Sequence, residues 1–408
     1  GQLRVSAEKI FFRRRQPCNY DFKLFRINIF KLMEALNNDI FLSFAIPTYS
    51  RAVFLQKLLN NILPQIKEVG ENIEVCISDN NSSDNTHEVV MGFKEKYQNL
   101  INYNKNEKNL GGEKNVFLAM KMAKGHFVWL LGDDDLIADN GIRDVVLFIK
   151  KNCKTNTGLI ALREKSYFID EKTGQKITFS SSFDIANPEA IKLSRKNIIE
   201  GHFASSAFMS ILVFNNNFLK KTLEQENDLI QQAIGDSYPH VFIYRLMFLK
   251  FNELEGIIFN KNIVLQEMAK YKVYIEGRFR HHYIAKNKIN RLLLSSKYAD
   301  ETMRAIFLKN QKGLKKDIIQ DIIMAKTFHS FNYLSFYGIF KLFFKHSSFN
   351  DAMIFSFVFL VMFFMPSFIL KPLLKIYFFI KYNKDWKRRW LFCETVHFRA
   401  SQGTEVVL

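Results

Sequence analysis

The stretch WLLGDDDLIADNG, residues 129–141, places three consecutive aspartates directly after a run of large apolar residues. The apolar run over residues 126–131 predicts a short buried strand that ends at these aspartates. A helix is predicted to follow over residues 140–151. Because like charges side by side repel one another, three carboxylates at the end of a buried strand require a compensating partner.

The segments around this stretch alternate between strand and helix patterns. Short apolar runs predict strands over residues 40–46, 72–78, 100–106, 158–162 and 204–214. Apolar residues at helical spacing predict helices over residues 52–67, around 89–93 and over 109–124. Strands that alternate with helices predict an α/β fold with a parallel, doubly wound sheet.

Ligands of open α/β sheets bind beyond the carboxyl ends of the strands. Seven residues fall at such ends: Pro47, Thr48, Tyr49, Asp79, Asp133, Asp134 and Asp135. Adjacent carboxylates tolerate each other when a divalent cation neutralises them, and hard oxygen ligands suit Mg²⁺ or Mn²⁺. Solvated aspartates that cap the following helix are the alternative. For a triplet with a fourth aspartate at another strand end, we favour the cation.

Such a cation could neutralise the charge that develops when a nucleoside diphosphate leaves. Asp79 could accept a hydrogen bond from a nucleobase N–H, whereas an Asx-rich loop with a helix cap at Ser83 or Asp84 is the alternative. The two glycines of NLGGEKN, residues 109–115, would let the backbone approach a ligand closely. An ordinary helix start explains the same glycines.

Four motifs occur in a fixed order: FAIPTYSR (44–51), ISDNNSSDNT (77–86), NLGGEKNVFLAM (109–120) and GHFVWLLGDDDLI (125–137). Together they resemble the nucleotide-sugar domain of family 2 glycosyltransferases, over about residues 40–250. The similarity is to the abequosyltransferase-like branch of bacterial surface-polysaccharide enzymes. It implies a GT-A fold (a Rossmann-like nucleotide-sugar domain), a divalent cation, Mn²⁺ or Mg²⁺, and inversion at the anomeric carbon.

The resemblance also implies roles for individual residues. Those at the nucleotide sugar are Pro47, Thr48, Tyr49, Arg51, Asp79, Asn81, Gly111, Gly112, Asn115 and Asp133. Family members commonly read Asp-x-Asp-Asp where this chain has Gly132 followed by the three aspartates. We assign the metal to Asp134 with Asp135 in support, and Asp133 to the ribose or the metal.

An inverting transfer needs a base that takes the proton of the acceptor hydroxyl. By the resemblance this base is a carboxylate about a hundred residues after the metal motif, and Asp236 is the candidate. A cap for the helix that starts near Tyr238 is the alternative role for Asp236. Glu200 is the reserve base, and His202 and His240 could line the acceptor site or be ordinary polar residues.

The chain beyond residue 260 is basic and aromatic. The whole sequence has 58 Lys and Arg against 40 Asp and Glu, a formal charge of +18, and 42 Phe. The uncharged run over residues 352–370 is long enough to cross a bilayer, but basic residues flank it on both sides. We expect membrane-associating helices that bend near Pro366, with both ends cytoplasmic. A spanning helix and a buried helical hairpin are the alternatives.

These patterns predict five parts. A basic arm or expression-derived segment (1–39) precedes the GT-A domain (40–260). A basic aromatic helical region (261–350), hydrophobic membrane-associating helices (351–390) and a tail (391–408) follow. The expected partners are a UDP-sugar, a polyprenyl-diphosphate-linked glycan acceptor and the cytoplasmic face of the bacterial inner membrane. The four cysteines are far apart and read as reduced and structural.

A non-catalytic basic protein that binds membrane surfaces or nucleic acid, with a transferase-like fold, is the alternative function. The positive charge alone would permit nucleic-acid binding. That charge is concentrated beside apolar segments, however, and no nucleic-acid-binding motif occurs in the sequence. We therefore expect no nucleic-acid partner.

Overall fold

The computed structural model describes residues 39–169, 176–180, 189–201, 208–235, 238–267, 285–301, 303–307, 353, 357, 360, 364 and 367–382. The chain divides into two units, residues 1–39 and 40–408, and the elements given below all lie in the second. The predictions for residues 1–38, for most of residues 308–366 and for the tail fall outside the described residues, as do those for Asp236 and His202.

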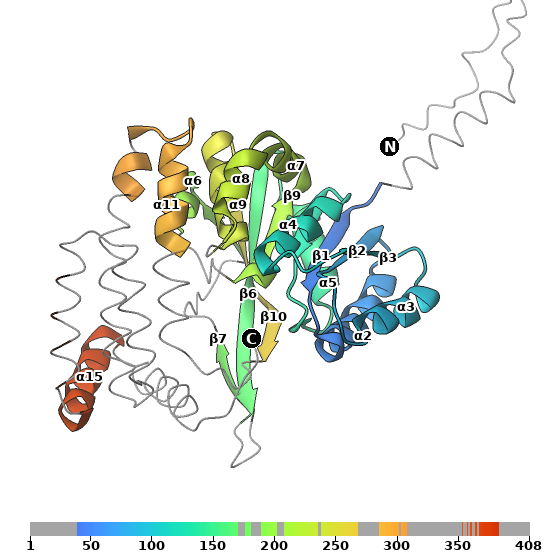
Figure 1. Cartoon of the computed structure of the whole chain (residues 1–408), viewed down its shortest axis with the longest axis horizontal. Coiled ribbons are helices and arrows are strands. Elements are labelled where there is room, and N and C mark those ends of the chain that lie inside the picture. The colour runs from blue at the N-terminus through green and yellow to red at the C-terminus, as the bar shows by residue number, and fades with distance from the viewer. Residues whose placement is uncertain are drawn as a thin grey trace, which may run out of the picture. The chain divides into compact units, whose positions relative to one another are not determined.

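The described strands form one ten-stranded sheet, with the order β3-β2-β1-β4-β9-β6-β10-β5 and with β7 on β6 and β8 on β10 (Figure 1). The strands are β1 Leu42–Thr48, β2 Ile73–Asp79, β3 Ile101–Lys105, β4 Phe127–Leu130, β5 Asp135–Ile137, β6 Thr157–Ile169, β7 Lys176–Ser180, β8 Ala190–Leu193, β9 Leu212–Asn215 and β10 Glu255–Glu267.

The sheet is mixed, which corrects the prediction of a parallel sheet. The four strands β3, β2, β1 and β4 are parallel to one another, as are β6 and β10. Strand β9 lies antiparallel between β4 and β6. The apolar run that predicted a strand over residues 204–214 indicated no direction, because direction depends on the connections. The fold is therefore α/β with a parallel half and a mixed half.

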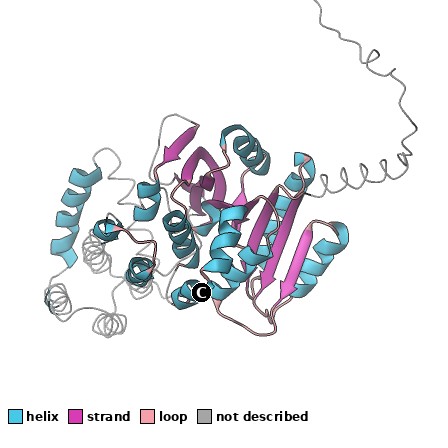
Figure 2. Ribbon diagram, turned by 90° about the horizontal axis from the view of Figure 1, so that it is seen from above, coloured by secondary structure: helices cyan, strands magenta, loops and turns pink. Residues whose placement is uncertain are grey.

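Helices lie on both sides of the strands (Figure 2). They are α2 Ala52–Val69, α3 Thr86–Lys96, α4 Gly112–Met122, α5 Gly141–Asn152, α6 Arg195–Glu200, α7 Asn216–Gln225, α8 Asn227–Ala233, α9 Pro239–Lys250, α11 Lys286–Ser295 and α15 Ser367–Tyr382, with a short 3₁₀ turn, η1, at Met209–Ile211. Helix α2 contacts α3 and α5, whereas α4 packs on β1 and β2 and also contacts α9.

Burial explains which segments form the centre of this domain. All seven residues of β1 are buried, as expected for a central parallel strand covered on both faces. Helix α2 buries only its apolar stripe and ends at Gly70, whose φ of 72° is the left-handed conformation common after a helix. Helix α9 is buried along every residue except Lys250, so it is a core helix rather than a surface helix.

The parallel pairing brings the predicted polar residues to one edge of the sheet. Thr48, the last residue of β1, is paired with Asp79, the last residue of β2. Strand β4 runs parallel to β1 on the other side and leads into the aspartate triplet. The described part of the chain contains no helix long and apolar enough to span a membrane.

Candidate active site

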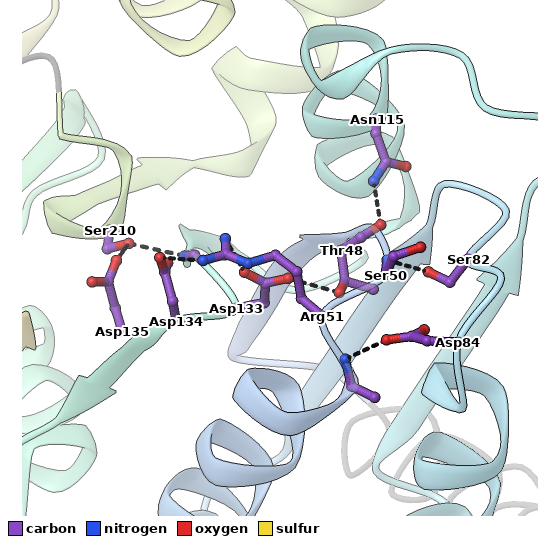
Figure 3. Close-up of polar contacts among 12 residues, drawn as sticks. Thr48, Ser50, Arg51, Ser82, Asp84, Asn115, Asp133, Asp134, Asp135 and Ser210 are labelled. Carbon is purple, nitrogen blue, oxygen red and sulfur yellow. Dashed lines mark hydrogen bonds and ion pairs between the residues drawn. The ribbon is translucent and has the colours of Figure 1, made fainter. Parts of the chain in front are cut away.

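The three aspartates point to different partners (Figure 3). Asp133 accepts a hydrogen bond from the Thr48 hydroxyl at 2.7 Å and pairs with Arg51 at 2.9 Å. Asp134 pairs with the other terminal nitrogen of Arg51 at 2.7 Å. Asp135 accepts a hydrogen bond from the Ser210 hydroxyl, which lies on η1. The repulsion within the triplet is therefore reduced by separation and by one guanidinium.

Burial makes the negative charge of this triplet costly. Desolvation raises the pKa of Asp135 to about 8, with a further rise from Asp134 and an opposing effect of the Ser210 hydrogen bond. Desolvation likewise raises the pKa of Asp133 to about 6, although Arg51 and Thr48 favour its ionised form. One guanidinium faces three carboxylates, so ionisation of all three leaves an excess of two negative charges.

Gly132 allows the two later carboxylates to fold back against the backbone. A Cβ atom at this position would lie 2.9 Å from Asp135 Oδ2 and 3.1 Å from Asp134 Oδ1. Ser210 also fixes this turn, because its hydroxyl accepts a hydrogen bond from the Gly132 backbone N–H at 2.9 Å. An aspartate here, as in the family pattern, would therefore shift the carboxyl groups of Asp134 and Asp135 from this arrangement.

The donor atoms suit a divalent cation in type and in charge. Hard carboxylate oxygens bind Mg²⁺ and Mn²⁺, and a dication would offset the repulsion within the triplet. Among the described residues, however, no three acidic, histidine or cysteine side chains converge on one point. Asp134 is the more exposed partner of Arg51, at 28% of its side chain against 4% for Asp133. Asp134 is thus the most accessible ligand of the triplet.

Asp79 lies at the end of β2 and is fully buried. One of its oxygens accepts hydrogen bonds from the backbone N–H and the hydroxyl of Ser82, at 2.8 and 2.6 Å. The other oxygen accepts a hydrogen bond from the hydroxyl of Tyr103 at 2.7 Å. Burial, and to a smaller extent this hydrogen bond, raises the pKa of Tyr103 well above its usual value. The carboxylate therefore organises the β2 and β3 ends. Its contact with a nucleobase remains a prediction.

Asn115 connects the first turn of α4 to the sheet. Its side chain is buried and accepts hydrogen bonds from the Ser78 hydroxyl at 2.7 Å and from the Asn106 amide at 3.1 Å. Its amide donates to the backbone oxygens of Thr48 at 3.1 Å and Ser78 at 2.9 Å. Asn115 thus holds the ends of β1 and β2 at a fixed separation.

The loop after β1 is fixed by a left-handed backbone conformation and by hydrogen bonds between side chains and its backbone. Ser50 has a φ of 48°, and its N–H donates to the Ser82 hydroxyl at 2.8 Å. Asp84 accepts the N–H of Ala52 at 3.0 Å, so it caps the start of α2 as well as bonding to Thr86 (Figure 3). Tyr49 in this loop is 45% exposed, and its contact with a ligand remains a prediction.

A comparison with known proteins identifies a family that shares the segment containing these residues. Residues 43–214 match the family model described as Glycosyl transferase family 2. The predicted resemblance to this family is therefore confirmed over this segment, which is less than half of the chain. Abequosyltransferase RfbV of Salmonella typhimurium is 32% identical over 217 residues, which cover 51% of this chain and 61% of that protein. The match therefore spans less than two thirds of that relative.

Two further proteins are similar to this chain. The GalNAc(5)-diNAcBac-PP-undecaprenol beta-1,3-glucosyltransferase of Campylobacter jejuni is 24% identical over 290 residues, which cover 69% of this chain and 88% of that protein. A solved structure of Staphylococcus aureus TarS 1–349 in complex with UDP-GlcNAc has a TM-score of 0.45 and 18% identity, and the match covers 69% of this chain and 81% of that chain.

The other residues predicted to bind the nucleotide sugar lie at the ends of strands and at the start of α4. Pro47 is buried within β1, and Asn81 is exposed with a φ of 67°. Gly111 precedes α4 with a φ of 85°. Among the described residues, no atom beyond the chain neighbours and the helix backbone lies within 4 Å of a Cβ built on Gly111 or Gly112. The space above the α4 N-terminus is therefore open, as close approach of a ligand requires.

The predicted acceptor side is only partly described. Glu200 ends α6, and His240 lies buried on α9 with its ring edge-to-face against Tyr238. The backbone N–H of Gly235 donates to the Glu113 carboxylate at 2.6 Å. Because Glu113 lies in the first turn of α4, the chain just before Asp236 lies beside the glycines that open that helix.

Sequence reasoning missed Ser210 and Tyr103 as parts of the site. Ser210 stands in an apolar stretch, and a buried hydroxyl there signals a required hydrogen bond. Tyr103 lies on the weakest predicted strand, and nothing local distinguishes it from a surface tyrosine. Only the spatial pairing of β3 with β2 brings its hydroxyl to Asp79.

Proposed function

We propose that this protein is an inverting, metal-dependent glycosyltransferase with a GT-A fold, which moves a sugar from a nucleoside-diphosphate sugar to a glycan hydroxyl. One observation carries the proposal. Within the segment that matches the family, Thr48 and Arg51 from the end of β1 meet Asp133 and Asp134 from the end of β4. Carboxylates beyond the carboxyl end of a strand are ligands that suit a diphosphate-bound cation.

Asp134 would hold Mn²⁺ or Mg²⁺, with Asp135 as second ligand. When bound, the cation would offset the charge that develops on the departing diphosphate. Asp133 stays fixed by Thr48, so it would orient the ribose or support the cation. The buried Asp79 cluster and the exposed Tyr49 would bind the nucleobase, with uridine as the default base.

Asp236 would take the proton from the acceptor hydroxyl. The contact between Gly235 and Glu113 supports this role, because it holds the preceding residue beside the α4 N-terminus. Lys288 holds this segment from a second direction, because its ammonium donates to the backbone oxygens of Ile234, at 2.8 Å, and of Gly235.

The acceptor would be a polyprenyl-diphosphate-linked glycan at the cytoplasmic face of the bacterial inner membrane, in the assembly of a surface glycan. The name of the Campylobacter relative includes an undecaprenol-linked glycan, which supports this class of acceptor. Met353, Phe357, Leu360 and Phe364 recur at helical spacing and are all more than half exposed. Exposed apolar side chains at this spacing on a basic chain favour contact with a lipid surface.

The deciding experiment screens nucleoside-diphosphate sugars for thermal stabilisation with and without Mn²⁺, and then measures hydrolysis of the best donor. We expect stabilisation that depends on Mn²⁺, and metal-dependent hydrolysis that Asp134→Ala abolishes. Asp228→Ala, at an exposed position of α8, is the matched control and should retain full hydrolysis. Hydrolysis that persists in Asp134→Ala, or no stabilisation by any donor, would refute the proposal.

The membrane part has its own test. A cysteine introduced beyond Trp390 should stay unlabelled when an impermeant thiol reagent is added to intact cells, because both ends of the apolar region would be cytoplasmic. Ready labelling from outside would contradict this topology. Membrane partitioning that resists nuclease would at the same time separate lipid binding from nucleic-acid binding.

A further inference from the structure

Arg51 occupies the position that a metal at Asp134 would need. Its two terminal nitrogens bridge Asp133 and Asp134, at 2.9 and 2.7 Å. A guanidinium and a dication repel each other, and a cation on Asp134 Oδ2 would compete with Arg51 for that oxygen. A cation bound by Asp134 Oδ2 therefore has to displace the Arg51 nitrogen from this oxygen.

Arg51 is placed so that its side chain can leave without disturbing the fold. It lies just before the first turn of α2, and its side chain is 40% exposed. The guanidinium rests over the ring of Phe54, 4.8 Å from the centroid, and Phe54 is itself 40% exposed. Asp133 remains held by Thr48 when Arg51 moves, because that hydrogen bond uses the other oxygen.

We propose that Arg51 is an exchangeable counter-cation, which neutralises Asp133 and Asp134 until a dication binds and then turns to the diphosphate of the donor. This inference rests on the proposed function of the same site. A planar guanidinium suits both states, since it pairs bidentately with carboxylates and with phosphates. Its exchange would couple metal binding to diphosphate binding, because each ligand favours the displaced position of Arg51.

The test compares Arg51→Gln with Lys57→Gln. Lys57 lies on α2, is exposed and also faces the Phe54 ring, at 6.0 Å, so its replacement removes the same charge without touching the carboxylates. Mn²⁺ binding is measured by electron paramagnetic resonance in the absence of nucleotide. UDP and uridine binding are measured by calorimetry in the presence of saturating Mn²⁺.

Arg51→Gln should raise the affinity for Mn²⁺ alone by about threefold or more, and should lower the preference for UDP over uridine by about tenfold. Lys57→Gln should change either quantity by less than about twofold. Arg51→Lys, which keeps the charge but cannot bridge two carboxylates, should also bind Mn²⁺ more tightly than the wild type. This variant carries the test if Arg51→Gln does not fold.

Two results would overturn the inference. Weaker or unchanged Mn²⁺ binding in both Arg51 variants would mean that Arg51 does not compete with the metal. An unchanged preference for UDP over uridine would mean that Arg51 stays on the carboxylates when a diphosphate binds. Failure of the wild-type protein to bind both Mn²⁺ and UDP would instead refute the proposed function, and this inference with it.

Discussion

The clearest test of the site's architecture is Asn115→Asp. The substitution keeps the shape of the side chain and replaces the amide group, which donates to the backbone oxygens of Thr48 and Ser78, with a carboxyl oxygen. Each lost hydrogen bond costs about 1 kcal/mol, and an acceptor held against acceptors in a buried position costs about 1–3 kcal/mol more. We therefore expect a loss of about 3–5 kcal/mol, which is large against a typical total of about 5–15 kcal/mol.

Denaturant unfolding followed by tryptophan fluorescence measures this loss, because Trp129 is fully buried beside the site. Burial raises the pKa of the new carboxyl group, and its protonated form restores one donor. The variant should therefore lose more stability at pH 8 than at pH 5. Nucleotide-sugar binding should weaken in parallel, since Thr48 is predicted to contact the donor and Ser78 precedes Asp79, which is predicted to do so as well.

The matched control is Asn217→Asp, at an exposed position in the first turn of α7. Its effect should stay within about 0.5 kcal/mol. A loss below about 1 kcal/mol in Asn115→Asp, or an equal loss in the control, would show that the amide does not hold the two strand ends together.

Three further predictions concern the core and the acidic turn. Hydrogen bonds from Lys250 and Tyr298 outweigh the effect of burial and lower the pKa of Glu226. Glu226→Gln should therefore cost about 3 kcal/mol of stability at pH 7. In pH-dependent unfolding, the difference in unfolding free energy between the wild type and this variant should disappear as the pH falls below about 4. Gly132→Ala should preserve the fold by circular dichroism but weaken Mn²⁺ binding about tenfold or more, because its Cβ would displace Asp134 and Asp135; unchanged binding would contradict the steric role of the glycine. Burial raises the pKa of Cys76 far above its usual value, so this thiol should resist alkylation in the native protein at pH 7.5, as mass spectrometry of labelled peptides would show.

The first half of the fold was predictable because its signals are local. The strands predicted over 40–46 and 72–78 match β1 and β2 within two residues, and the helix predicted over 140–151 matches α5 within one. Strand β10 was missed, and its pairing with β6 shows why. The register shifts between Ile258 and Asn262 mark irregular pairing, which breaks the alternation that sequence reading relies on. The family resemblance, in contrast, is confirmed over residues 43–214.

The site was predictable in its location but not in its contacts. Strand ends and the aspartate triplet follow from sequence, because parallel strands end at one edge. The partners of the triplet do not follow, since Arg51 is more than eighty residues from Asp133 and Ser210 is 75 residues from Asp135. The sequence led us to expect a cation at Asp134, with Asp135 in support and Asp133 on the ribose or the metal. The structure adds protein partners for each carboxylate, which are Thr48 and Arg51 for Asp133, Arg51 for Asp134, and Ser210 for Asp135.

The antiparallel strand β9 explains how Ser210 reaches Asp135. An antiparallel neighbour begins beside the end of its partner, so the residues just before β9 lie next to the carboxyl end of β4, where Trp129 is paired with Val213. This geometry delivers Ser210 to the acidic turn, where its backbone oxygen accepts the Trp129 indole N–H at 2.8 Å. A parallel strand at this position would end, rather than begin, beside the turn. The turn is thus clamped by β1 through Thr48 and by η1 through Ser210, and the reversal of β9 is what lets one short loop hold a buried cluster of negative charge in place.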